Sequence, residues 1–142
     1  MMNNLTIREA DGSDLDLLAE MNRQLIEDEQ HDNPMNIGQL KERMQRFIET
    51  DYIAYLFLCE GEITGYSLIR HHSNPLYIRH YFIRREYRRQ GLGREAFRVL
   101  TGHLQTDNLD VEAMFWNERA LSFWRSLGFK ERSVYFRSGP NP

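Results

Sequence analysis

Arg88-Arg89-Gln90-Gly91-Leu92-Gly93-Arg94 joins an apolar run rich in β-branched and aromatic residues, 76–83, to an amphipathic run that begins at Gly91. We therefore expect a strand, a basic loop and a helix, in that order. The first turn of a helix has about four unpaired backbone N–H groups and about half a positive charge. Such a turn binds phosphate without any side chain, and Gly91 and Gly93 let the backbone approach closely because they lack a Cβ. The segment therefore predicts a site for linked phosphates.

Positive charge is concentrated around this segment. Residues 84–94 contain five arginines and Glu86, which gives this window a net charge of +4 in a chain whose net charge is −3. A local basic cluster in an acidic protein indicates a site for a small anion, and we expect no nucleic-acid partner. Arg88, Arg89 and Arg94 can add charge-assisted hydrogen bonds to the same phosphate oxygens. The alternative is that the glycines form a tight turn and the arginines a solvated surface.

Two other phosphate-binding motifs fit poorly. Residues 91–96 formally match G-x-G-x-x-G/A, the dinucleotide pattern, which requires a tight strand-to-helix turn and an acidic residue at the end of the next strand. Here the turn is a long arginine-rich loop, and the next expected strand ends in Trp116-Asn117. A P-loop requires Gly-Lys-Ser/Thr, whereas Gly93 is followed by Arg94-Glu95.

The remaining elements are predicted from hydrophobic periodicity. Apolar residues recur at helical spacing from Leu15 to Leu25 and from Ile37 to Phe47, with Ser13 as the expected cap of the first helix. We also expect helices over 91–103 and 117–127, the second ended by Gly128. The expected strands are 4–8, 52–59, 63–69, 76–83, 111–116 and 129–136, the last as a strand or hairpin. The order β-α-α-β-β-β-α-β-α-β predicts a mixed sheet with helices against it.

Length and composition predict a single domain, residues 1–142, because 41% apolar and 12% aromatic residues are typical of one soluble globular unit. No apolar run approaches the ~20 residues that cross a bilayer, and no signal-peptide pattern is present, so we expect no membrane partner. The single cysteine, Cys59, excludes an intrachain disulfide, favours a cytoplasmic location and is expected to be a buried structural thiol. We expect no metal site, since adjacent His71 and His72 would point to opposite faces of a strand.

Two motifs, with the expected strands between them, resemble the GNAT superfamily of acetyl-CoA-dependent N-acetyltransferases over essentially the whole chain. Arg88–Gly93 matches its Arg/Gln-x-x-Gly-x-Gly/Ala motif, and 83–87 is similar to the end of its preceding strand. Asn117–Phe129 is similar to its Asn-x-x-Ala-x-x-Phe-Tyr-x-x-x-Gly-Phe signature. The resemblance implies an α+β fold with a mixed, mostly antiparallel sheet and helices on both faces. It also implies direct transfer of an acetyl group from acetyl-CoA to a primary amine of a small molecule or protein, by a monomer or a homodimer.

The resemblance further implies which residues bind the cofactor. Backbone groups of Tyr81, Phe82 and Ile83 would pair with the pantetheine arm like an added strand, and amides of Arg88–Arg94 would hold the pyrophosphate. Asn117 would bond the cofactor near its reactive end, a role compatible with that of a helix N-cap. The predicted cofactor-binding residues are Tyr81, Phe82, Ile83, Arg88, Arg89, Gln90, Gly91, Leu92, Gly93, Arg94, Asn117 and Trp124.

The residues for proton transfer depart from the family pattern. Many relatives place a tyrosine that acts as the acid where this chain has Trp124, whose indole cannot supply a proton. Relatives also often carry a carboxylate on the strand before the glycine loop, and residues 77–82 contain none. The candidate base is His80, acting directly or through water, and the alternative is a structural histidine. Tyr135 is the candidate acid, with core packing as its alternative. A backbone N–H near Ile83 would stabilise the oxyanion, and catalysis would depend mostly on positioning.

Candidate acceptor-binding residues lie between the first two expected helices and on the strand before the basic loop. Glu27, Asp28 and Glu29 would attract a cationic amine, unless they form a solvated helix end. Arg79 would recognise a carboxylate on the substrate or pair with Glu29. A second hypothesis is a non-catalytic acyl-CoA-binding or sensing domain, motivated by Trp124 and the missing carboxylate. Both hypotheses predict coenzyme A binding, and turnover separates them.

Overall fold

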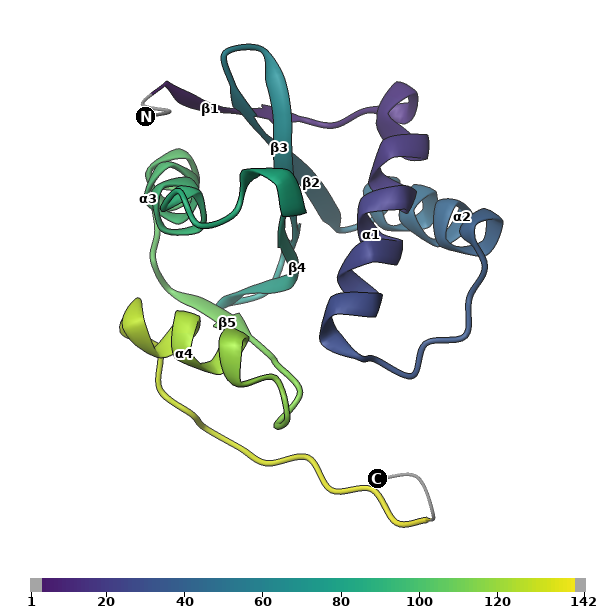
Figure 1. The fold of residues 1–142 in the computed structure, drawn as a ribbon, viewed down its shortest axis with the longest axis vertical. Helices are drawn as coiled ribbons and strands as arrows, with labels where there is room; N and C mark the ends of the chain where they lie inside the picture. Colours follow the sequence, from purple (N-terminus) through teal and green to yellow (C-terminus); the bar gives the residue numbers. More distant parts are fainter. Residues whose placement is uncertain (1–3, 140–142) are drawn as a thin grey trace.

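The computed structural model describes residues 4–139, which form one five-stranded sheet with helices on both faces (Figure 1). Neighbouring strands follow the order of the chain, and only the last pair is parallel. This confirms the mixed, mostly antiparallel α+β fold. The strands are β1 (Leu5–Glu9), β2 (Tyr52–Cys59), β3 (Glu62–Arg70), β4 (Leu76–Ile83) and β5 (Leu109–Val111).

The helices cover the sheet in two pairs, α1 with α2 on one face and α3 with α4 on the other (Figure 1). Successive side chains of a strand point to opposite faces, so Leu56 of β2 packs beneath α1 and α2 while Tyr55 packs beneath α3 and α4. Cys59 is fully buried on the second face, as predicted. The helices are α1 (Leu15–Glu29), α2 (Ile37–Ile48), α3 (Leu92–Leu104) and α4 (Glu118–Ser126), with short 3-10 turns at Gly12–Asp14 and Arg85–Tyr87.

β4 contains a bulge at Arg79. Leu68 of β3 pairs with His80 and the next residue, Ile69, pairs with Ile78, which leaves Arg79 without a partner in the register. An extra residue in one strand shifts the alternation of side chains. Ile78 therefore packs on the α3–α4 face, whereas Phe82, four residues later, packs on the α1–α2 face.

β5 is short and ends where the expected strand was predicted to begin. The prediction of a strand over 111–116 is wrong, because only Leu109–Val111 pairs with β4. Phe115 and Trp116 lie instead in the loop before α4 and are 73% and 39% exposed. β-propensity favoured these aromatic residues as a strand, but the chain stops pairing with β4 after Val111, although β4 itself continues to Ile83.

Three further expectations about element ends need correction. Ser13 is not the cap of the first helix: Asp11 and Asp14 form a capping box at the 3-10 turn that leads into α1. α1 continues through Glu29 and ends at Gln30, which has a left-handed φ of 50°. The expected strand over 129–136 does not form: residues 130–139 are exposed and pair with no strand of the described chain. Within residues 4–139, no helix is long and apolar enough to span a bilayer.

Candidate active site

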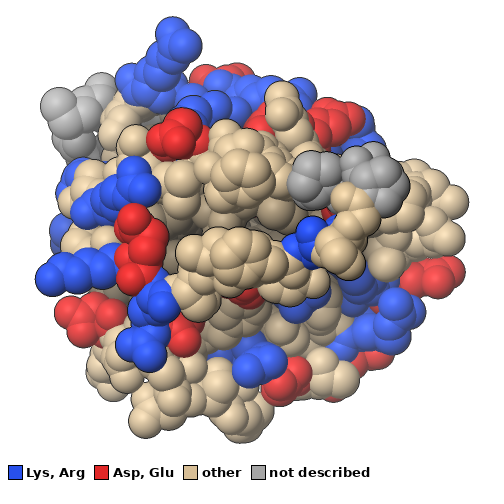
Figure 2. All heavy atoms as spheres, turned by 90° about the horizontal axis from the view of Figure 1, so that it is seen from below, with Lys and Arg blue, Asp and Glu red and all other residues tan. Residues whose placement is uncertain are grey.

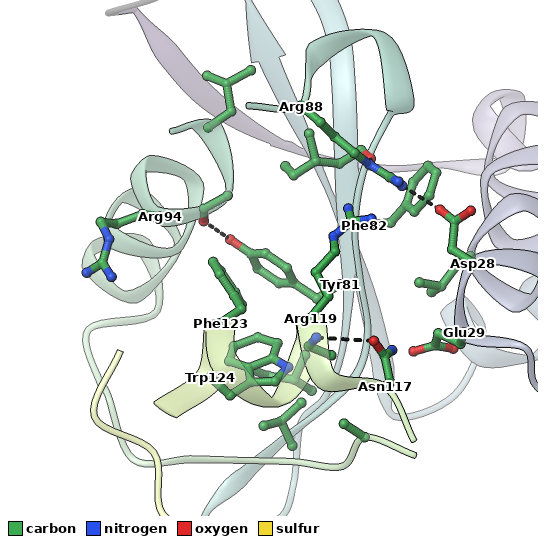
Figure 3. A pocket seen from close by; sticks show the side chains of 18 of the residues that line it. Asp28, Glu29, Tyr81, Phe82, Arg88, Arg94, Asn117, Arg119, Phe123 and Trp124 are labelled. Carbon is green, nitrogen blue, oxygen red and sulfur yellow. Dashed lines mark hydrogen bonds and ion pairs between the residues drawn. The ribbon is translucent and has the colours of Figure 1, made fainter. Parts of the chain in front are cut away.

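A pocket of about 470 Å³ opens where β4 and β5 diverge. Its walls come from β4, the basic loop and first turn of α3, the β5–α4 loop with the start of α4, and the last turn of α1 (Figure 3). β5 pairs with β4 only as far as Ile78, so the following residues of β4 have no described strand on that side. The early end of β5 thus creates the pocket.

The free edge of β4 presents backbone groups to this pocket. The amide N–H of Arg84 donates to Thr64 of β3, and the Phe82 carbonyl lies against Gly65 of β3. Alternate residues of a strand direct their peptide groups to opposite edges, so the peptide groups of Tyr81 and Ile83 face the pocket. Two of the three residues predicted to pair with an extended ligand therefore offer peptide groups to it, and Phe82 contributes its side chain to the lining.

The start of α3 adds unpaired donors to the same pocket. Gly91 is the N-cap residue, with a left-handed φ of 74° and no side chain to bond the first turn. The first-turn N–H groups of Leu92, Gly93 and Arg94 have no hydrogen-bond partner among the described residues. A Cβ at Gly91 would meet no atom within 4 Å, so the space in front of this turn is open.

Gly93 also has a packing role that the sequence did not indicate. A Cβ at Gly93 would lie 3.2 Å from the Phe123 ring, so this glycine lets α3 pack closely on α4. The Tyr81 hydroxyl, which lies at the back of the pocket, donates to the Gly93 carbonyl oxygen over 2.6 Å (Figure 3). Both contacts fix the first turn of α3 against β4 and α4.

Most arginines of the basic window bond to the protein itself. The Arg88 Nε donates to the Ile83 carbonyl (2.8 Å), and its Nη2 lies 2.6 Å from Asp28 Oδ2. Arg85 is 2.9 Å from the same carboxylate. Burial alone would raise the pKa of Asp28, but hydrogen bonds from these two arginines hold it below its usual value. The guanidiniums of Arg85 and Arg88 therefore brace the loop against α1.

Two other arginines keep their charge available at the pocket. These are Arg89 and Arg119, which line the pocket without a hydrogen-bond or ion-pair partner among residues 4–139. Arg94 also lines the pocket, but its guanidinium donates to Ser126 Oγ of α4 over 2.9 Å. Gln90 is exposed and does not line the pocket. Sequence analysis missed Arg119, although its position two residues after a predicted helix N-cap was a usable signal. The pocket thus combines a free strand edge, an open helix N-terminus and two unpaired guanidiniums.

Comparison of the sequence with models of known protein families shows which family the chain belongs to. The sequence matches the model of the acetyltransferase (GNAT) family over residues 17–129. The chain belongs to the GNAT family. Comparison with curated proteins found no match.

Several solved GNAT structures share the fold over nearly their whole length. A possible acetyltransferase from Clostridium difficile 630 superposes with a TM-score of 0.78 at 18% identity, covering 96% of this chain and 97% of that one. PaiA N-acetyltransferase from Thermoplasma acidophilum, in complex with coenzyme A, gives 0.75 at 15%, with 94% of both chains covered. An aminoglycoside N-acetyltransferase in complex with coenzyme A gives 0.70 at 13%, with 95% of both covered.

Asn117 and Trp124 of the second GNAT motif both line the pocket. The Asn117 side-chain oxygen accepts the Ala120 N–H (3.1 Å), which confirms it as the N-cap of α4 and leaves its amide NH₂ free to donate (Figure 3). Trp124 is 8% exposed and packs edge-on against Tyr81 and Phe97, with ring centroids 5.2 and 5.9 Å away. Its indole is therefore part of the aromatic core behind the pocket.

The three acidic residues at the end of α1 have different environments. Glu27 pairs with Arg23 and Arg85, and Asp28 with Arg85 and Arg88, so both are occupied by arginines. Glu29 lines the pocket and has no basic partner among the described residues. Burial, and secondarily the charge of Asp28, raise the pKa of Glu29 to about 7. Of the three, Glu29 alone is a free carboxylate on the pocket wall.

His80 and Tyr135, the two candidates for proton transfer, do not line the pocket of this GNAT domain. His80 lies on the α1–α2 face, where its Nδ1 is 3.0 Å from the Tyr66 hydroxyl. Burial, followed by the charges of Arg43 and Arg79, lowers the pKa of His80 to about 3. Tyr135 is 79% exposed on the extended segment after α4.

Figure 2 shows the molecule from below, where basic and acidic side chains alternate around a largely uncharged surface. The positive charge on this face is therefore not continuous. No group of three or more His, Cys, Asp or Glu side chains among residues 4–139 is placed to hold a metal ion.

Proposed function

We propose that this GNAT domain transfers the acetyl group of acetyl-CoA to a primary amine by direct attack within a ternary complex. One observation supports this most strongly: the free edge of β4 and the open first turn of α3 line the same pocket. An extended arm that ends in linked phosphates fits both features at once. The peptide groups of Tyr81 and Ile83 pair with the arm, and the amides of Leu92, Gly93 and Arg94 bind the phosphates.

The side chains around the pocket suit the rest of such a ligand. Arg89 and Arg119 supply charge to the phosphates without first breaking an internal ion pair. The free amide of Asn117 bonds the arm near the reactive end. Arg88 acts indirectly, because its bonds to Ile83 and Asp28 hold the loop in position.

Glu29 takes the role of base that His80 was expected to fill. An alkylamine has a pKa of ~10.4 and must lose a proton before it attacks the thioester. A carboxylate at the pocket wall with a pKa near 7 accepts that proton, directly or through one water, more readily than an ordinary glutamate. The new carbon–nitrogen bond then forms as the carbon–sulfur bond breaks, and the thiolate leaves.

The oxygen of the attacked carbonyl gains negative charge, and the Ile83 N–H on the free edge of β4 donates a hydrogen bond to it. The thiolate has no assigned proton donor. Trp124 is an indole in the core, and the Tyr81 hydroxyl already donates to Gly93. Positioning and the surrounding positive charge therefore supply most of the rate enhancement.

A non-catalytic acyl-CoA sensor is the second candidate, and the buried Trp124 in place of a tyrosine is the observation that favours it. A sensor binds acetyl-CoA without releasing thiol in the presence of any amine. The acetyltransferase releases thiol when an acceptor is added.

The Gly91→Glu variant tests the cofactor site. Its carboxylate would occupy the open space before the first turn of α3 and repel phosphate, so we expect calorimetric affinity for coenzyme A to fall more than 100-fold, about 3 kcal/mol. Gly102→Glu, on the same helix with nothing within 4 Å of its Cβ, is the matched control and should bind normally. Normal affinity in a folded Gly91→Glu variant would refute the assignment.

A further inference from the structure

Two arginines that no described carboxylate neutralises lie at and beside the acceptor side of the pocket. Arg79 lines the pocket from the bulge of β4, and Arg43 lies behind it on α2. Neither forms an ion pair with any residue in the described part of the chain, whereas Arg85 and Arg88 of the basic loop do. Arg43 is partly buried, and its Nε is fully enclosed without a hydrogen-bond partner. Enclosing positive charge without a counter-ion is costly, which indicates that a ligand provides one.

The Arg79 guanidinium is held in place by stacking. Its central carbon lies 4.9 Å from the centroid of the Phe47 ring and 6.0 Å from that of Tyr52, and the Tyr52 hydroxyl accepts a hydrogen bond from Nη1 over 3.3 Å. That is the one hydrogen bond of this side chain to described residues. An arginine has five N–H donors in a planar fork, so most remain free. Arg43 also stacks on Phe47 (5.4 Å), and its Nη2 donates to the buried Asn22.

The bulge explains why Arg79 can reach the pocket. Without the extra residue, the strict alternation of β4 would place residues 79 and 81 on the same face. With it, Tyr81 packs under α3 and α4, while Arg79 turns toward α2 and the pocket mouth. Bulges commonly redirect a side chain next to a functional site.

Glu29 gives the pocket the opposite charge on its α1 wall. The pocket therefore carries, on different elements, a carboxylate without a basic partner at Glu29 and a guanidinium without an acidic partner at Arg79. We propose that the acceptor is a primary amine that also carries a carboxylate, with the amine at Glu29 and the carboxylate bound by the fork of Arg79. This inference rests on the proposed acetyltransfer and names its substrate class. Arg43 adds positive potential behind the fork without touching the substrate.

The test uses amines that differ in one group. Phenylalanine, phenylalaninamide and phenethylamine share a side chain, but only the first bears a carboxylate; the corresponding sets from tyrosine and alanine cover polar and small side chains. Thiol release is measured with acetyl-CoA, and binding is measured by calorimetry on protein saturated with coenzyme A. We expect the acid to exceed its amide at least 10-fold in kcat/KM or in affinity, and this ratio to fall toward one in Arg79→Gln.

Arg70→Gln is the matched control, because Arg70 stacks on Tyr77 at 5.8 Å and does not line the pocket. The ratio should be unchanged in that variant. Equal use of acid and amide, a preference for the amide, or an acid preference that survives Arg79→Gln overturns the inference while leaving acetyltransfer established. Failure of every compound to react or bind, with coenzyme A binding intact, overturns it and leaves the cofactor site standing. The same ratio can be measured for phosphoethanolamine against ethanolamine. A ratio larger than that of every acid and amide pair would mean that the site prefers a phosphate, and would also overturn the inference.

Discussion

Replacing Glu29 with glutamine should make the protein more stable at alkaline pH and much less active. The pKa of Glu29 is raised from 4.5 to about 7, first by burial and then by Asp28. Because the fold favours the protonated form, the carboxyl costs nothing below pH 4.5, where it is protonated in both folded and unfolded states. The cost appears as the pH rises from 4.5 to 7 and is complete above 7.

The size of the effect follows from that shift. A shift from 4.5 to about 7 corresponds to an upper bound of ~3 kcal/mol at ~1.4 kcal/mol per pKa unit. Glu29 lines an open pocket, so water screens part of this cost, and we expect Glu29→Gln to gain ~1–2 kcal/mol of unfolding free energy at pH 8 and little at pH 4.5. Glutamine keeps the shape but accepts no proton, so kcat/KM should fall ~100-fold or more while affinity for coenzyme A is retained.

Urea unfolding followed by tryptophan fluorescence at pH 4.5 and pH 8 measures the stability change. Glu27→Gln is the control on the same helix: it removes exposed ion pairs with Arg23 and Arg85, worth at most ~1 kcal/mol, and should give no gain at pH 8. The reasoning is refuted if the difference between Glu29→Gln and the parent protein is the same at both pH values. A stability gain at pH 8 with unchanged kcat/KM would refute only the role of Glu29 as a base and would leave the stability argument intact.

Three further substitutions, one of them a control, test how the pocket is held in place. Gly65→Ala should destabilise the fold by ~3 kcal/mol in urea unfolding, because its Cβ would clash with the Phe82 backbone carbonyl oxygen and lie 3.0 Å from the Ile83 Cα. Gly102→Ala, in open space on α3, should stabilise by up to ~1 kcal/mol, and equal midpoints for the two variants would contradict this reasoning. Asp28→Asn should lower coenzyme A affinity about 10-fold, or ~1.4 kcal/mol, because it removes the ion pair with Arg88 that holds the basic loop in position. Unchanged affinity in calorimetry would show that this ion pair is not needed for binding.

The fold, and most of the residues that line the pocket at the start of α3 and of α4, could be predicted from the sequence. Their signals are local: hydrophobic periodicity gave the order of elements, and the glycine at position 91 marks the N-cap of α3 with its φ of 74°. The cap at Asn117 follows from the same kind of signal. Such features depend on residues within a few positions of one another, so one chain is sufficient to indicate them.

The sequence gives only candidates for the acceptor side, because which of them is free depends on contacts between distant segments. Glu27, Asp28 and Glu29 look alike in sequence, and only the approach of Arg85 and Arg88, nearly 60 residues later, leaves Glu29 as the free carboxylate. His80 has a suitable ordinary pKa, but its burial against Tyr66 is a consequence of tertiary packing. Local propensity also gave a wrong strand over 111–116, because the chain stops pairing with β4 after Val111 while the edge of β4 continues to Ile83.

Two irregularities of neighbouring strands, the early end of β5 and the bulge of β4, shape the pocket. Because β5 stops at Val111, the edge of β4 beyond Ile78 stays open, and an extended ligand can add to the sheet there. Because β4 has an extra residue at Arg79, the side chain just before that open edge turns toward the acceptor side. Removing either irregularity would be compatible with a stable sheet. A regular sheet would close the cofactor groove or direct Arg79 elsewhere, so both departures from regular pairing are better explained by the site than by stability.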